Sequence, residues 1–164
     1  MIIRKAEVKD ATFIAQISVD TWKDTYKGLI DENILNGRKV DDKRISWVVE
    51  NIKNPDFTIL VYEDKEILGY LWAGPTRDKQ EIKNELCAIY VKKSAQRKGI
   101  GSKLIEEYKQ IINNETFYLY MIKNNVIAST FYDKAGGVVC EKYNRQLDLK
   151  NQVIEEVCYV FEAQ

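Results

Sequence analysis

Two glycines one residue apart, Gly99 and Gly101, follow an apolar run at residues 86–91 of this 164-residue chain. Because they have no Cβ atom, the backbone can turn sharply there, and successive N–H groups can converge at the start of a helix. The partial positive charge of a helix N-terminus attracts anions, and Arg97 and Lys98 add charge beside it. The spacing therefore predicts a site for a phosphate or pyrophosphate group, although two glycines can also serve only to shape a helix start.

Two other glycine motifs that bind phosphates do not fit. A P-loop needs G-x-x-x-x-G-K-[ST], a spacing that is absent around Lys103. A dinucleotide fingerprint needs a third glycine where this chain has Leu104, and the motif here lies in mid-chain. Lys plus Arg equals Asp plus Glu at 25 each, so the chain has no net basic field for nucleic acid. A nucleotide- or RNA-binding function therefore ranks last.

Histidine is absent from the chain, which excludes imidazole bases and metal sites that use histidine. A general base must then be a carboxylate, a lysine, a tyrosine or water. The three cysteines, Cys87, Cys140 and Cys158, lie in apolar runs and form no C-x-x-C pair. We expect them to be reduced, inert thiols, and we expect no metal site.

Two separated motifs carry a resemblance to a known family. The first reads Gln96-Arg-Lys-Gly-Ile-Gly101, and the second reads Asn125-x-x-Ala-x-x-Phe-Tyr-x-Lys-x-Gly136. In this order they resemble the GNAT superfamily of acyl-CoA N-acyltransferases, and the resemblance extends over nearly the whole chain. It implies transfer of an acetyl group from acetyl-CoA, as cosubstrate, to a primary amine by direct attack in a ternary complex, without a metal.

The resemblance also implies where the cofactor binds. The backbone of residues 89–91 would hold the pantetheine arm as an added strand does, and residues 96–102 would hold the pyrophosphate. The strands at 86–91 and 117–122 would splay apart to admit the thioester. The implied cofactor-binding residues are Ile89, Tyr90, Val91, Gln96, Arg97, Lys98, Gly99, Ile100, Gly101, Ser102, Asn125, Ala128 and Tyr132.

Two residues are candidates for proton transfer. In the family, the tyrosine at the position of Tyr132 acts as general acid beside the thioester sulfur, which implies that role here; an ordinary half-buried tyrosine is the alternative. Some members place a general base four residues before the pantetheine-binding segment, which corresponds to Glu85. A solvated glutamate at a strand edge is an equal alternative, and a carboxylate can also act through a chain of waters.

The family usually forms its acceptor wall between the first two helical segments, which here hold Trp22, Tyr26 and Ile30. Trp72, on a neighbouring strand, is a further candidate, although a core position is more common for tryptophan. Aromatic faces attract an ammonium group. Four acidic residues lie near them in the sequence: Asp20, Asp24, Asp31 and Glu32. They would favour a cationic acceptor, but a solvated helix face is the more common role of such acids.

A sheet and several helices must position these residues. Apolar runs predict strands at 2–5, 57–62, 67–73, 86–91, 117–122, 138–149 and 153–161. Helical spacing predicts a first helix that Asp10 caps and that ends near Gly28, and further helices at 40–54, 101–112 and 126–134. We expect one α/β (α+β) domain over residues 1–164. The expected fold is a GNAT-like central sheet, mixed, mostly antiparallel and twisted, of about seven strands with about four helices on its two faces, splayed between the fourth and fifth strands.

Within this family, the function of the chain has two readings. The first is an N-acetyltransferase whose acceptor is a small amine, polyamine, amino acid, peptide or protein N-terminus, or aminoglycoside. The second is a non-catalytic acyl-CoA-binding sensor or partner module, against which the presence of Tyr132 argues. No apolar run is long enough to span a membrane, so we expect a cytoplasmic protein without membrane or nucleic-acid partners. Aromatic residues of the C-terminal strands, such as Tyr143 and Tyr159, would allow a homodimer.

Overall fold

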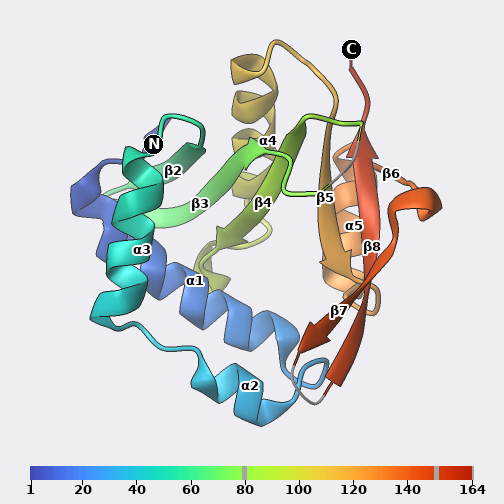
Figure 1. Ribbon diagram of the computed structural model, residues 1–164. Helices are drawn as coiled ribbons and strands as arrows, with labels where there is room; N and C mark the ends of the chain where they lie inside the picture. Colours follow the sequence, from blue (N-terminus) through green and yellow to red (C-terminus); the bar gives the residue numbers. More distant parts are fainter. Residues whose placement is uncertain (79–80, 150–151, 164) are drawn as a thin grey trace.

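The computed structural model describes residues 1–78, 81–149 and 152–163, and these form one mixed sheet covered by helices (Figure 1). The strands of the described residues are β1 Ile2–Lys5, β2 Thr58–Asp64, β3 Glu66–Pro75, β4 Asn84–Val91, β5 Phe117–Ile122, β6 Val138–Val139, β7 Arg145–Leu149 and β8 Gln152–Phe161. The α-helices are α1 Ala11–Tyr26, α2 Glu32–Gly37, α3 Asp42–Lys53, α4 Ile100–Ile111 and α5 Val126–Lys134.

The strand order is β1-β2-β3-β4-β5-β8-β6, with β7 also paired to β8. All pairs of these strands are antiparallel except β4 with β5, which is parallel. This arrangement confirms the predicted mixed, mostly antiparallel sheet. The parallel pair joins two antiparallel halves, one of β1 to β4 and the other of β5 to β8.

Strands β4 and β5 splay apart because only a short part of each strand pairs with the other. Only Asn84 with Phe117 and Glu85 with Tyr118 are in register, at the start of both strands. Beyond these two pairs the strands separate, and Figure 1 shows a gap in the ribbon between the lower ends of β4 and β5. The sheet is therefore continuous at one end of this pair and divided at the other.

Each face of the sheet is covered by its own set of helices. One core places α4 residues such as Leu104 and Ile105 against Leu71 and Leu119, and Phe131 of α5 packs on the same side. On the opposite face, α1 and α3 bury apolar side chains against β2 and β3. The sheet residues facing α1 and α3 are Ile59, Val61, Ile67, Tyr70, Trp72, Ala88 and Tyr90. Alternate residues of β4 thus point to different layers, as the two-residue period of a strand requires.

Three local predictions differ from the structure. The Asp10 carboxylate does not cap α1; it accepts hydrogen bonds from the Glu7 amide and from Arg4, because residue 10 ends a 3₁₀ turn before the helix. The short helix α2 lies in a stretch too polar to show an apolar stripe, with only Leu35 fully buried.

Residues 138–149 form β6 and β7 separated by a 3₁₀ turn, not one strand, since the Asn144 side chain accepts the Cys158 amide hydrogen at 2.9 Å.

Candidate active site

The predicted pyrophosphate loop connects β4 to α4. A 3₁₀ turn at Lys93–Ala95 leaves the strand, and the Gln96 side chain donates to the Val91 carbonyl at 3.0 Å. Gly99 is the N-cap residue of α4, with φ of 78°, and no side chain caps the helix. The first amide groups of α4 therefore keep their N–H donors unbonded by a cap, which is the arrangement that binds an anion.

Gly99 and Gly101 are required in this loop for different structural reasons. Gly99 occupies the left-handed region, where a side chain is strained, and an added Cβ would meet nothing within 4 Å. A Cβ on Gly101 would lie 2.9 Å from Cζ of Phe131 in α5. The first glycine thus supplies the turn, and the second lets α4 approach α5 closely.

The end of β4 offers its free edge to the gap. Ile89, Tyr90 and Val91 pair with β3 on one side and have no pairing with β5 on the other. The side chains of Ile89 and Val91 pack on the layer of α4, whereas Tyr90 packs on the layer of α1. This edge can accept an extended ligand in the way that a sheet accepts another strand.

Helix α5 places Asn125 and Tyr132 beside the gap. The Asn125 side chain accepts the Ala128 amide hydrogen at 3.1 Å, so its oxygen caps α5 and only its amide group is left for a ligand. Tyr132 is buried among aromatic rings, with Tyr159 at 5.6 Å between ring centroids. Burial raises the pKa of Tyr132, and the nearby Tyr90 adds to this. A phenol of this kind stays protonated at neutral pH and can act only as a proton donor.

Three tyrosines from three elements meet at the gap. Burial raises the pKa of Tyr26 at the end of α1, and its neighbours Tyr90 and Tyr132 contribute further. Tyr26 and Tyr90 lie close enough for each to shift the pKa of the other. The predicted acid, Tyr132, is therefore electrostatically coupled to a residue of the proposed cofactor strand and to a residue of the proposed acceptor wall.

Glu85 lies at the closed end of the β4–β5 gap and is only 1 % exposed. Its Oε2 accepts hydrogen bonds from the Arg77 amide at 3.0 Å, the Arg77 Nε at 3.1 Å and the Tyr118 hydroxyl at 3.1 Å. Arg77 also makes an ion pair with Oε1. Glu85 is therefore neither a solvated strand-edge glutamate nor a carboxylate with free lone pairs directed at the gap.

The predicted acceptor wall is assembled at the end of α1. Trp22 and Tyr26 contact edge to face at 5.5 Å, and with the buried Ile30 they pack against Ile122 of β5 and Ile154 of β8. The turn after α1 is also hydrogen bonded to β8. Gln152 accepts from the Asp31 amide at 2.8 Å and donates to the Leu29 carbonyl at 3.0 Å. Helix α1, the turn after it and two strands of the β5-to-β8 half thus form this wall.

Trp72 lies away from the other three acceptor candidates. Its ring packs between Trp47 of α3 at 4.9 Å and Phe57 at 5.4 Å, on the layer of α1 and α3. The Arg77 guanidinium is 5.9 Å from its ring, which places Trp72 near Glu85 instead of near Tyr26. Its buried indole N–H has no acceptor among the described residues.

The structure also reveals charged residues that sequence reasoning misses. Arg145 of β7 makes ion pairs with Asp78 at 2.6 Å and with Glu156 of β8 at 2.7 Å. On the other side of the acceptor wall, the Arg38 guanidinium lies 4.5 Å from the Trp22 ring centroid. No sequence spacing links these residues, because the register of β7 and β8 brings Arg145 to Glu156 and the folded chain brings the other partners together.

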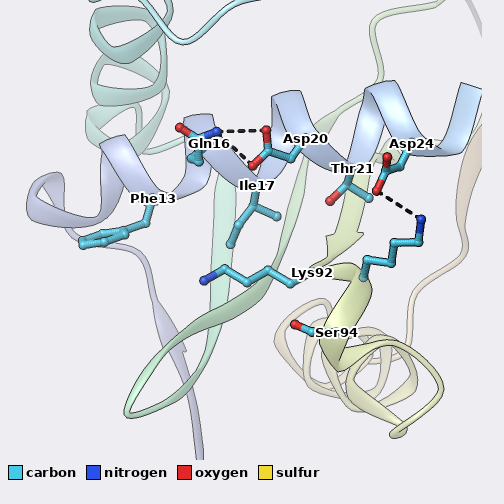
Figure 2. A pocket seen from close by; sticks show the side chains of 9 residues that line it. Phe13, Gln16, Ile17, Asp20, Thr21, Asp24, Lys92 and Ser94 are labelled. Atoms are coloured by element: carbon cyan, nitrogen blue, oxygen red, sulfur yellow. Dashed lines mark hydrogen bonds and ion pairs between the residues drawn. The ribbon is translucent and has the colours of Figure 1, made fainter. Parts of the chain in front are cut away.

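A cavity of about 350 Å³ lies between α1 and the start of the β4–α4 loop (Figure 2). Asp20 and Asp24 of α1 line it, and neither is free: Gln16 donates to Asp20 at 2.9 Å, and Asp24 pairs with Lys93 at 3.7 Å. None of the predicted cofactor-binding residues lines this cavity. The two acids are thus engaged by their own neighbours on the helix and loop.

No group of three or more Cys, Asp and Glu side chains in the described part of the chain is arranged to hold a metal ion. No helix within residues 1–78, 81–149 and 152–163 has the length and apolar character needed to cross a membrane.

Comparison with known proteins identifies the family. The sequence model of the acetyltransferase (GNAT) family matches residues 16–137. The chain is 28 % identical over 129 residues to the uncharacterized N-acetyltransferase YuaI of Bacillus subtilis, covering 75 % of this chain and 72 % of that one. It is 25 % identical over 142 residues to a spermidine N(1)-acetyltransferase of Thermoplasma acidophilum, covering 82 % and 86 %.

A solved structure shows the same fold. The PaiA N-acetyltransferase of Thermoplasma acidophilum, crystallised with coenzyme A, superimposes with a TM-score of 0.74 at 22 % identity and covers 99 % of this chain and 98 % of its own. The glycine loop at the uncapped start of α4, the parted strands β4 and β5, and the match over residues 16–137 all agree. The chain belongs to the acetyltransferase (GNAT) family of N-acetyltransferase enzymes.

Proposed function

We propose that this protein transfers an acetyl group from acetyl-CoA to a primary amine by direct attack in a ternary complex. One observation carries the proposal: β4 and β5 pair at only two positions, and the free edge of β4 leads into a loop that ends at an uncapped helix start. An extended arm with an anionic end fits such an edge followed by such a loop. The relatives named above, one of them crystallised with coenzyme A, support this assignment.

The chain offers three sets of groups to the cofactor. The amide groups that open α4, at Ile100, Gly101 and Ser102, face the pyrophosphate, with the side chains of Arg97 and Lys98 beside them. Backbone groups of residues 89–91 hold the pantetheine arm, with Gln96 supporting the loop through its bond to Val91. Asn125 and Ala128 of α5 contact the pantetheine arm from the other side.

Acetyl-CoA supplies the acetyl group and a thiolate that must be protonated as it leaves. Tyr132 donates that proton in our proposal, because burial raises its pKa and keeps the hydroxyl protonated. Trp22, Tyr26 and Ile30 line the side from which the amine arrives, and Trp72 flanks the Glu85 end.

Glu85 is our candidate for the base that accepts the ammonium proton, and its surroundings limit how it can act. Arg77 and Tyr118 occupy its carboxylate, so the proton has to reach it through the Tyr118 hydroxyl or through a water. Water acting directly as the base is the alternative.

The non-catalytic alternative shares the cofactor site and differs only in turnover. A sensor needs the α4 loop and the β4 edge but has no use for a protonated phenol at the thioester. The buried Tyr132 at the gap therefore favours the enzyme. A small-molecule or peptide amine is our general proposal for the acceptor, and we propose a cytoplasmic protein that can form a homodimer.

The substitution Tyr132→Phe tests the proposed function. We expect release of free CoA thiol, which requires an amine, to slow about 100-fold or more, since general acid catalysis typically contributes that much. The dissociation constant of CoA should stay the same because the ring remains. A thiol-detecting assay with a panel of amines gives the rate, and calorimetry gives the affinity.

Tyr159→Phe is the matched control, because its ring packs on Tyr132 while its hydroxyl donates to Asp133. It should keep the wild-type rate. Equal turnover in Tyr132→Phe and wild type would remove the acid role of Tyr132. CoA binding without thiol release from any amine would favour the sensor module.

A further inference from the structure

One side of the β4–β5 gap carries an excess of negative charge. Asp78 and Glu156 both pair with the single guanidinium of Arg145, so two carboxylates share one positive charge. The Arg145 guanidinium lies 3.6 Å from the centre of the Tyr120 ring, which fixes it on the sheet. Glu156 is opposite Ile122 in the register of β5 and β8, on the face that packs against the end of α1.

The other side carries two guanidinium groups and one acid beside them, Asp41, whose carboxylate accepts the Arg44 amide hydrogen at 2.8 Å. Arg38 follows α2, and Arg44 lies in the first turn of α3. Arg38 stacks on Trp22, and the Arg44 Nε donates to the Lys39 carbonyl at 3.0 Å. Neither makes an ion pair with any carboxylate of the described residues. Two half-buried guanidinium groups beside one carboxylate leave an excess of positive charge, which a bound anion would offset.

The two charged sides are connected through the acceptor wall. Arg38 stacks on Trp22, Trp22 contacts Tyr26, and Tyr90 at the edge of β4 lies close enough to Tyr26 to raise its pKa. Burial raises the pKa of Tyr90, and the charge of Arg38 opposes this; burial also raises the pKa of Tyr26, with Glu156 contributing. The positive and the negative side therefore both influence the pKa values of the tyrosines that line the gap.

We propose that the acceptor is a zwitterion, an amino acid or a closely related small molecule, whose carboxylate binds Arg38 and Arg44 while its amine lies on the side of Glu156. This inference rests on the acetyl transfer proposed above and adds the class of acceptor. An arginine fork binds a carboxylate through two parallel hydrogen bonds. A polyamine has no group for this pair of arginines, which would repel its second ammonium group.

Matched acceptors test the proposal with the full-length protein and saturating acetyl-CoA. Each L-amino acid of a panel, such as phenylalanine, methionine and lysine, is compared with the amine that lacks only its carboxylate, and spermidine is included. We expect kcat/KM to be at least about tenfold higher for the best amino acid than for its decarboxylated partner, as a charge-assisted hydrogen bond implies.

Variants of the two arginines make the test specific. Arg38→Gln and Arg44→Gln should each raise KM for that amino acid at least about tenfold and leave the decarboxylated amine unaffected, whereas Arg38→Lys should keep part of the effect. Lys39→Gln is the matched control: it removes an exposed charge from the same segment and should change nothing. Melting temperatures verify that each variant is folded.

A binding measurement separates this inference from the proposed function. Calorimetry of the same amino acid with CoA-loaded protein should show an affinity that Arg38→Gln weakens by a similar factor. Binding of this kind without acetyl transfer would support the inference and contradict the transferase function. Transfer that is fastest with spermidine or decarboxylated amines, or that is unchanged in Arg38→Gln and Arg44→Gln, would overturn the inference and leave the transferase function intact.

Discussion

At the scale of single residues, the pKa of Cys87 distinguishes between two routes of acyl transfer, direct attack by the amine and transfer through an acyl-thiol intermediate. Cys87 lies within two residues of Glu85 in β4, where a covalent acyl-thiol intermediate would be conceivable. Burial raises the pKa of its thiol to about 12, with Arg77 opposing and Glu85 adding to the shift. Only a minute fraction of such a thiol is ionised at neutral pH, and the thiolate is the nucleophile. This favours direct attack by the amine.

We therefore predict that Cys87 is inert at neutral pH and that its alkylation accelerates about tenfold per pH unit between pH 8 and 11, as expected below a pKa of about 12. Site-resolved mass spectrometry after iodoacetamide treatment measures this. The unfolded protein is the control, since all three thiols should react there with their ordinary pKa. A stable acetyl group on Cys87 after incubation with acetyl-CoA alone would contradict direct transfer.

At the scale of elements, the contact between α4 and α5 connects the cofactor loop to the proposed acid. Gly101 opens α4, and its missing Cβ makes room for the Phe131 ring, which adjoins Tyr132 in α5. A side chain at position 101 would push Phe131 away and shift the helix that carries Tyr132.

We predict that Gly101→Ala destabilises the fold by about 1–3 kcal/mol, the usual cost of overpacking, and lowers kcat through displacement of α5. Adding Phe131→Leu, which removes the atoms that clash, should recover most of both losses. Chemical denaturation and steady-state kinetics of the single and double variants measure this. If the double variant behaved as the sum of its two single changes, the α4–α5 contact would not be the cause.

The elements that a local pattern defines were predictable from the sequence. The strand at 117–122 and the helix at 126–134 match β5 and α5 residue for residue, because turn residues and apolar periodicity mark both. The glycine motif located the cofactor loop, and the strand order splits the sheet at the expected pair.

Features that depend on register between distant strands were not predictable. Between Trp72–Ala88 and Ala73–Leu86 the register of β3 and β4 shifts, so Cys87 is an extra residue in β4. This bulge turns Glu85 to the face of Tyr118 and away from the layer of α4, where alternation from Ile89 would place it. The pairing of Glu85 with Arg77, and of Arg145 with Asp78, likewise needs the third dimension.

At the scale of the whole molecule, a cofactor in the gap would join the two antiparallel halves of the sheet. Among the described residues, they are joined by two residue pairs of β4 and β5, by side-chain bonds such as Tyr118 to Glu85 and Arg145 to Asp78, and by the surrounding helices. An arm bonded to the β4 edge adds interactions that exist only in the folded state. Ligand binding of this kind raises the free energy of unfolding.

We predict that CoA at 100 times its dissociation constant stabilises the protein by about 2.7 kcal/mol. In a domain of this size this corresponds to a rise in Tm of about 5–10 °C. Pantetheine, which lacks the pyrophosphate, should give a smaller rise. Hydrogen exchange should show new protection at Ile89 and Val91, because the Lys92 amide bonds to Leu68 on the β3 side and alternate amides face the free edge. An unchanged Tm with millimolar CoA would contradict the cofactor site.

Gln152 determines the outline of the opening through which an acceptor enters. Its two hydrogen bonds tie the turn after α1 to β8, while the pairs at Asn84 and Glu85 close the other end of the gap. The gap is therefore closed by protein contacts at both of these ends. We expect a slender, mobile arm that carries the amine to reach such a gap more readily than the surface of a folded macromolecule.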